Sequence, residues 1–309
     1  MRFMKLLIAV ILVIVIGMMG FAYLSPEKAT RFAINADRHR SGLILKEIDL
    51  AGGLHYAYLE GGKGEPLMLL HGFGGNKDNF TEMARFLTSH YRVIIPDLIG
   101  FGESSHPQEA DYAPAAQAER LRSLAHALGI ERLHLGGNSM GGQIVMTYAT
   151  RYPAEVASLW LLDPGGVWSA PKSELMKIIE ETGHNPLMVR SEDDFARIIK
   201  LAMFKPPFIP RFMINVMAQE RIHNYALEER IFMQIKATDS VEKSVSGLTV
   251  PTLIVWGDQD RLLSVAAAGI LHKLMPRSQV IIMLDTGHLP MLERPQQSAG
   301  DYLRFRTSL

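Results

Sequence analysis

Short apolar segments alternate with polar turns along most of the chain from residue 43 onward. Residues 43–50 and 54–59 flank the turn Ala51-Gly52-Gly53, which predicts a β-hairpin. Further strand-like apolar runs lie at 66–70, 92–95, 133–135 and 156–162, with helical patterns between them at 80–89, 115–128 and 140–151. Strands that alternate with helices predict an α/β fold, in which a mostly parallel sheet carries helices on both faces.

This alternation stops between residues 166 and 247. The segment has helical patterns and is rich in Met, Phe and Ile, with breaks at Pro206, Pro207 and Pro210. Alternation resumes with a strand at 249–256, a helix at 264–274, a strand at 279–284 and a helix at 295–306. We therefore expect one α/β domain in two parts, 43–165 and 248–309, with residues 166–247 inserted as a helical lid.

The N-terminal segment has a different pattern. Residues 6–24 contain no charged residue and follow Arg2 and Lys5. A helix of this length spans about 28 Å, close to the roughly 30 Å hydrocarbon core of a bilayer. Residues 1–25 are therefore predicted to form a membrane anchor, followed by a linker at 26–42. A cleaved secretory signal is the alternative, because Gly20 and Ala22 provide a small-x-small cleavage site.

The membrane side of the folded part is a hypothesis. Only a very short tail precedes the apolar run, which favours export of the catalytic domain to the periplasm or the cell exterior. Basic residues flank the run on both sides, with Arg2 and Lys5 before it and Lys28 and Arg31 after it. The positive-inside rule therefore does not decide the orientation.

Composition excludes several classes of protein. The 309 residues contain 32 Lys plus Arg and 32 Asp plus Glu, so no overall field attracts nucleic acid. The chain has no cysteine, which excludes disulfides, thiolate zinc sites and cysteine nucleophiles. No His-Glu-x-x-His motif or carboxylate cluster predicts a metal, and no Gly-x-Gly-x-x-Gly segment predicts a dinucleotide, so we expect no cofactor. Nothing in the sequence indicates an oligomeric state.

One serine lies where a strand is expected to turn into a helix. Ser139, in Gly137-Asn138-Ser139-Met140-Gly141, follows the apolar run 133–135 and precedes a helical segment. The motif by itself is weak, but a sharp strand-to-helix turn exposes the hydroxyl, and the flanking glycines relieve crowding. The helix N-terminus favours the negative charge that develops during acyl transfer. Ser139 is therefore the predicted nucleophile.

A serine nucleophile requires a base and an acid. Most of the eleven histidines lie in helices or polar turns, whereas His288 follows the last expected strand and can return to the same sheet edge as Ser139. Asp260, which follows the preceding strand, is the preferred acid. Asp163 competes because it also ends a strand, and Asp258 is the least favoured because Asp at that place commonly forms turns. The order Ser139, Asp260, His288 is the order used by α/β-hydrolases.

Backbone amides complete the expected site. His71-Gly72-Phe73-Gly74-Gly75 directly follows the strand at 66–70, and its glycines allow a backbone N–H to turn toward an oxyanion. The N–H groups of Phe73 and Met140 are predicted to form a two-donor oxyanion hole.

Together these motifs resemble the α/β-hydrolase-fold serine hydrolases over residues 43–309. The resemblance rests on the segments 71–74, 97–102, 137–142, 256–260 and 287–288. Segments 77–78, 204–207 and 291–295, with the N-terminal run, are more closely similar to membrane-anchored monoacylglycerol lipases and bacterial triacylglycerol lipases or esterases. The resemblance implies the triad Ser139, Asp260 and His288 and the Phe73 and Met140 oxyanion hole. Ile99 stands where this superfamily often has Pro, which affects only the local turn.

The side chains of the expected lid indicate the class of substrate. Its apolar side chains suit acyl chains, so we predict cleavage of lipid or monoacylglycerol esters through an acyl-enzyme. The residues predicted to contact substrate are Met203, Phe204, Phe208, Phe212 and Met213. Two alternatives stay open. Gly-Asn-Ser-Met-Gly-Gly also occurs in C–C hydrolases that act on ring-cleavage products, and a catalytically inactive hydrolase fold could serve as a membrane-tethered binding protein.

Overall fold

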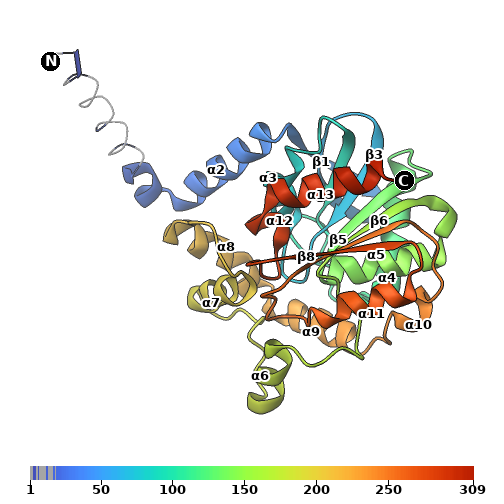
Figure 1. The fold of residues 1–309 in the computed structure, drawn as a ribbon. Coiled ribbons are helices and arrows are strands. Elements are labelled where there is room, and N and C mark those ends of the chain that lie inside the picture. Colours follow the sequence, from blue (N-terminus) through green and yellow to red (C-terminus); the bar gives the residue numbers. More distant parts are fainter. Residues whose placement is uncertain (1–2, 5, 7–11, 13–16, 18) are drawn as a thin grey trace.

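Eight strands form one sheet in the computed structural model, which describes residues 3–4, 6, 12, 17 and 19–309 (Figure 1). The strands are β1 (Leu43–Leu50), β2 (Leu54–Gly61), β3 (Glu65–Leu70), β4 (Tyr91–Pro96), β5 (Leu133–Asn138), β6 (Val156–Leu162), β7 (Thr252–Gly257) and β8 (Ser278–Met283). Their order in the sheet is β1-β2-β4-β3-β5-β6-β7-β8. Pairings β1–β2 and β2–β4 are antiparallel and the others are parallel. The mostly parallel α/β sheet expected from the sequence is therefore confirmed.

Helices cover both faces of this sheet (Figure 1). In β3, Met68 and Leu70 belong to one apolar core, whereas Leu67 and Leu69 belong to the other, as the period of two in a strand requires. The first core includes helices α4 (Pro114–Ala127), α5 (Met140–Arg151) and α11 (Ala266–Leu274). The second includes α3 (Thr81–Ala84), α12 (Pro290–Glu293) and α13 (Pro295–Thr307). Burial on both faces explains why the inner strands read as continuous apolar runs.

Five helices lie between β6 and β7 in chain order. They are α6 (Glu174–Thr182), α7 (Glu192–Ala202), α8 (Arg211–His223), α9 (Tyr225–Lys236) and α10 (Glu242–Val245). Ser173 and Ser191 cap α6 and α7 by accepting from the N–H groups of Met176 and Asp194. The segment from 166 to 247 is thus helical, as its sequence pattern indicates.

One helix is shorter than the sequence pattern predicts. The pattern favours a helix over 80–89, but α3 ends at Ala84 and turns follow to residue 90. In these turns the N–H of Phe86 donates to the carbonyl of Met83, and that of Leu87 to Ala84. These contacts span three residues and tighten the chain before it enters β4.

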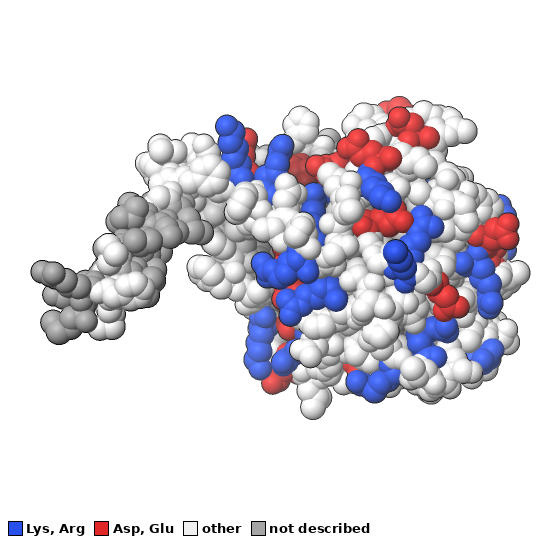
Figure 2. Space-filling model, turned by 90° about the horizontal axis from the view of Figure 1, so that it is seen from above, with Lys and Arg blue, Asp and Glu red and all other residues white. Residues whose placement is uncertain are grey.

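The N-terminal part joins the body through α2 (Pro26–Arg40), which contacts α8. Arg38 of α2 forms a two-point ion pair with Asp78, with both bonds at 2.6 Å. Most of the predicted anchor, residues 6–24, lies outside the described residues, and no helix within the described part has the length and apolarity needed to cross a membrane. Lys and Arg lie among Asp and Glu over the face drawn in Figure 2.

Candidate active site

Ser139 occupies a strained turn between β5 and α5. Its φ is 55° and its ψ is −117°, which is unusual for a residue other than glycine. The turn is fixed at the backbone, because the Ser139 N–H donates to Leu162 at 3.1 Å and its carbonyl accepts from the Gly165 N–H at 2.8 Å. This is the geometry by which a strand-to-helix turn exposes a serine hydroxyl.

The glycines around Ser139 are required by close backbone approach. A Cβ atom on Gly137 would lie 2.4 Å from the backbone of Gly141, and one on Gly141 would lie 2.4 Å from the Leu70 carbonyl oxygen. A Cβ on Gly72 would lie 3.0 Å from the Ser139 Cβ. The Gly-x-Ser-x-Gly spacing is therefore a packing requirement of the turn between β5 and α5.

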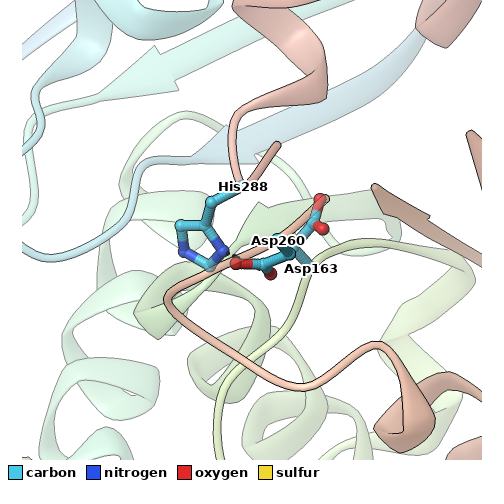
Figure 3. Close-up of side chains that lie close together, drawn as sticks. All are labelled: Asp163, Asp260 and His288. Carbon is cyan, nitrogen blue, oxygen red and sulfur yellow. Dashed lines mark hydrogen bonds and ion pairs between the residues drawn. The ribbon is translucent and has the colours of Figure 1, made fainter. Parts of the chain in front are cut away.

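His288 and Asp260 are directly hydrogen-bonded (Figure 3). Nδ1 of His288 lies 2.8 Å from Oδ2 of Asp260, and both side chains are buried. The Asn138 side-chain amide donates to the His288 carbonyl at 2.9 Å, which links the imidazole loop to the residue before Ser139. An acceptor on Nδ1 leaves Nε2 free to act as a base.

Four residues meet at the carboxyl edge of adjacent strands. Ser139 follows β5, Asp163 follows β6, Asp260 follows β7 and His288 follows β8. Of the three aspartates considered from the sequence, Asp260 bonds the imidazole, and Asp163 lies beside it. Asp258 instead accepts from the Thr286 N–H at 3.4 Å, a contact between the loop after β7 and the loop after β8.

Ser139 and His288 line the same cavity, together with Phe73 and Met140. Within the described part of the chain, the Ser139 hydroxyl makes no hydrogen bond, and the N–H groups of Phe73 and Met140 donate to no protein group. Unpaired amides at a helix N-terminus and a glycine turn are suited to stabilise an oxyanion. The serine, the histidine and the two residues with the backbone N–H groups expected from the sequence therefore line one cavity.

The cavity measures about 370 Å³ and is mainly apolar. Its apolar walls come from the loop after β6, from α6 and from α9, chiefly Val167, Trp168, Leu175, Met176, Ile179, Phe232 and Ile235. None of these residues is among the substrate contacts predicted from the sequence. The one available signal was the spacing of Leu175, Met176 and Ile179, which places them on one face of α6.

The substrate contacts predicted in the inserted segment lie elsewhere. None of Met203, Phe204, Phe208, Phe212 and Met213 lines this cavity. Met203 is buried, whereas Phe204 and Phe208 are 44% and 92% exposed. These five residues therefore do not line the cavity beside Ser139, because apolar residues at helical spacing do not reveal which surface they face. Their contact with substrate stays a prediction.

One cluster of described residues has the side-chain types of a metal site. Single ligand atoms of Asp163, Asp260 and His288 lie within 4.8 Å of one another. However, the Asp260 oxygens already accept from the N–H groups of Leu262 and Leu263 as well as from His288. This donor set favours an acid–base network over a cation site.

Two charged residues outside the predicted set support the site. The Glu293 carboxylate accepts from the N–H groups of Gly287, Phe204 and Lys205 at 2.8 to 2.9 Å. Arg221 of α8 lies 5.6 Å from the Phe73 ring and against Gly74, so α8 packs on the loop that carries the Phe73 N–H. These contacts connect segments far apart in sequence, and no local pattern predicts them.

Known proteins resemble this chain over most of its length. Residues 65–295 match the family model of the alpha/beta hydrolase fold. Lipase 1 of Psychrobacter immobilis is 46% identical over 288 residues, covering 91% of this chain and 89% of that protein. A monoacylglycerol lipase of Xenopus laevis is 28% identical over 271 residues, covering 82% and 80%. The crystal structure of a membrane phospholipase A is 38% identical, with a TM-score of 0.89, and covers 100% of this chain and 99% of that chain.

Proposed function

The chain belongs to the α/β-hydrolase family, and we propose that it is a serine hydrolase that cleaves carboxylic esters of lipids. Ser139 is the nucleophile, His288 the general base and Asp260 the acid that orients the imidazole. The observation that carries this proposal is the 2.8 Å contact between His288 and Asp260, beside a cavity that Ser139 also lines.

The reaction follows from these positions. His288 Nε2 takes the Ser139 proton as Oγ attacks the ester carbonyl, and the N–H groups of Phe73 and Met140 stabilise the oxyanion. His288 then protonates the leaving alcohol, and the acyl group remains on Ser139. A water activated by His288 releases the acid and restores the serine. Asp260 stabilises the imidazolium during both steps.

A lipid substrate is favoured by the shape and chemistry of the cavity. Its walls are apolar and its volume of about 370 Å³ suits an acyl chain next to the nucleophile. Relatives named lipase and monoacylglycerol lipase point the same way. The same relatives favour ester cleavage over C–C cleavage of ring-cleavage products, and a site with all of its parts argues against a binding protein without activity.

We also propose how the substrate enters the cavity and where the enzyme is located. Helices α6 and α9 wall the cavity and act as the lid, so their movement admits the substrate. Residues 6–24 hold the enzyme at a membrane, with the catalytic domain exported, or are removed as a secretory signal. Cell fractionation with N-terminal sequencing of the mature protein separates anchoring from cleavage.

The decisive experiment compares Ser139→Ala with Ser264→Ala, since Ser264 lines the same cavity. Both are assayed on a chain-length series of nitrophenyl esters and monoacylglycerols and labelled with a fluorophosphonate probe. We expect Ser139→Ala to lose labelling and at least about 10³-fold in turnover, and Ser264→Ala to retain both. Undiminished turnover by Ser139→Ala would refute the mechanism. Cleavage of a vinylogous diketone without ester cleavage would favour the C–C hydrolase.

A further inference from the structure

A second carboxyl group lies beside the proposed triad acid. Asp163 directly follows β6, has a φ of 46° and is fully buried. One of its oxygens, one oxygen of Asp260 and one ring nitrogen of His288 lie within 4.8 Å of one another (Figure 3). No lysine or arginine is paired with either carboxyl among the described residues. Two buried carboxylates at this distance, without a cation, cannot both be ionised at low cost.

The hydrogen-bond donors show which carboxyl is ionised. Asp260 Oδ1 accepts from the N–H groups of Leu262 and Leu263 at 2.8 and 3.0 Å. Its Oδ2 accepts from Trp256 Nε1 at 3.1 Å and from His288 Nδ1 at 2.8 Å. Four donors directed at one carboxylate stabilise its charge.

Asp163 has the opposite surroundings. Its Oδ1 accepts one bond, from the Gly257 N–H at 2.9 Å, and its buried Oδ2 has no donor within the described structure. Burial is the main cause that raises the pKa of Asp163 well above its usual range, followed by the negative charge of Asp260. Glu293 of α12 acts in the same direction. A hydroxyl on Oδ2 would remove the unpaired acceptor by donating to Asp260.

We propose that Asp163 is a neutral carboxylic acid that donates its hydrogen to Asp260 and thereby positions the triad acid. The inference rests on the triad of the proposed function. No bond to substrate is formed or broken by Asp163, and its proton stays between the two carboxyl groups. Asp163 is thus a positioning residue. Asp163 and Asp260 follow neighbouring strands, and both belong to one site.

The variants are chosen to fit the backbone at residue 163. Asn tolerates positive φ, supplies an N–H₂ donor toward Asp260 and keeps a carbonyl for the Gly257 N–H. Glycine also tolerates this φ but supplies neither group. We expect Asp163→Asn to retain turnover within about threefold and Asp163→Gly to lose about tenfold or more in kcat, because the acid loses its partner.

The pH profile separates a neutral Asp163 from an ionised one. If Asp163 is neutral, Asp163→Asn leaves the acid limb of kcat/KM where it is in the parent enzyme. If Asp163 is ionised, the same variant removes a negative charge near His288. The limb would then move about one pH unit lower, and the proposal would be overturned.

Two NMR measurements do not depend on turnover. The His288 ring is titrated in Ser139→Ala and in Ser139→Ala with Asp163→Asn, where equal midpoints support a neutral Asp163 and a downward shift contradicts it. The Asp163 carboxyl carbon is titrated in the unaltered chain, where a protonated-acid shift at neutral pH is expected and a carboxylate shift overturns the proposal. Should Ser139→Ala remain an active hydrolase, the proposed function fails, whereas these titrations still report on Asp163.

Discussion

The backbone N–H of His288 donates to the carbonyl oxygen of Ala202 at 2.7 Å. Ala202 is the last residue of α7, so this bond joins the inserted helices directly to the loop that carries the imidazole. Glu293 strengthens the connection, because its carboxylate accepts from Gly287 on one side and from Phe204 and Lys205 on the other. The C-terminal end of α7 is therefore held against the loop that carries His288 by direct hydrogen bonds.

Removal of the Glu293 carboxylate should loosen this connection. In Glu293→Ala three backbone N–H groups lose their acceptor, so we expect a loss of about 1–3 kcal/mol in the free energy of unfolding. Turnover should fall by about tenfold or more because His288 is less well oriented. Glu293→Gln keeps one acceptor oxygen and should lie between the parent and Glu293→Ala. Urea unfolding and ester hydrolysis measure the two effects.

Asp285→Asn is the matched control for Glu293. The Lys205–Asp285 ion pair joins the same two segments at 3.0 Å, but both side chains are 58% exposed. Loss of such a pair costs no more than about 1 kcal/mol. Equal effects of Asp285→Asn and Glu293→Ala would show that the carboxylate of Glu293 has no special role.

Two glycine-to-alanine substitutions, one in the turn at Ser139 and one in α11, should have opposite effects. A Cβ on Gly137 would lie 2.4 Å from the Gly141 backbone, so Gly137→Ala should shift the turn and abolish most activity. Gly269 lies within α11 with nothing within 4 Å of its added Cβ. Gly269→Ala should therefore stabilise the protein by about 0.5–1 kcal/mol at unchanged activity. Thermal unfolding and ester turnover test both, and an active, stable Gly137→Ala would contradict this account of the turn.

Sequence predicts the sheet and the catalytic edge because both depend on local patterns. Apolar runs define the parallel strands, and parallel strands bring Ser139, Asp260 and His288 to one edge whatever the intervening loops. Asp163 and Asp260 both follow strands of the sheet, and only the chain order Ser139, Asp260, His288 favoured Asp260 as the acid. That choice depends on the loop after β7, where the Leu262 and Leu263 N–H groups bind the Asp260 carboxylate.

The cavity beside Ser139 could not be predicted for a different reason. Its walls depend on how α6 and α9 pack, and packing between helices distant in sequence leaves no local signal. The apolar residues around Phe208 have the composition of an acyl-binding surface, yet Phe208 points to solvent. Composition predicts an acyl-binding surface in the inserted segment, and none of the five residues named in that prediction lines the cavity beside Ser139.

His71 should make the fold sensitive to acid. Its Nε2 accepts from the Leu98 N–H at 3.0 Å, so the ring proton lies on Nδ1, which donates to the Gly72 carbonyl at 2.8 Å. Burial, as the largest cause, lowers the pKa of His71 in the folded state. Folding therefore favours the neutral imidazole. The contribution of His71 to the free energy of unfolding is present above the unfolded-state pKa of about 6.5, and it is lost as the pH falls toward the lower pKa of the folded state.

A variant series isolates this contribution. His71→Asn should flatten the decline of the unfolding free energy below about pH 6.5, although its stability at neutral pH is lower because Leu98 has a poorer acceptor. His184 is exposed, and His184→Asn should leave the profile unchanged. Urea unfolding at a series of pH values gives the slopes. A profile for His71→Asn parallel to that of the parent would show that another group is responsible.

Filling the cavity should restrict the length of the acyl chain. Ile179 lines the wall contributed by α6, and Ile179→Trp adds volume to a space of about 370 Å³. Each methylene excluded costs about 1 kcal/mol or more, so kcat/KM for long-chain esters should fall by about tenfold or more, with short-chain esters within about twofold. Phe208→Ser alters a side chain that is 92% exposed and outside this cavity, and it should leave hydrolysis of dissolved esters unchanged. If Phe208→Ser shortened the preferred chain and Ile179→Trp did not, the acyl group would bind along the inserted segment near residue 208 instead of in the cavity beside Ser139.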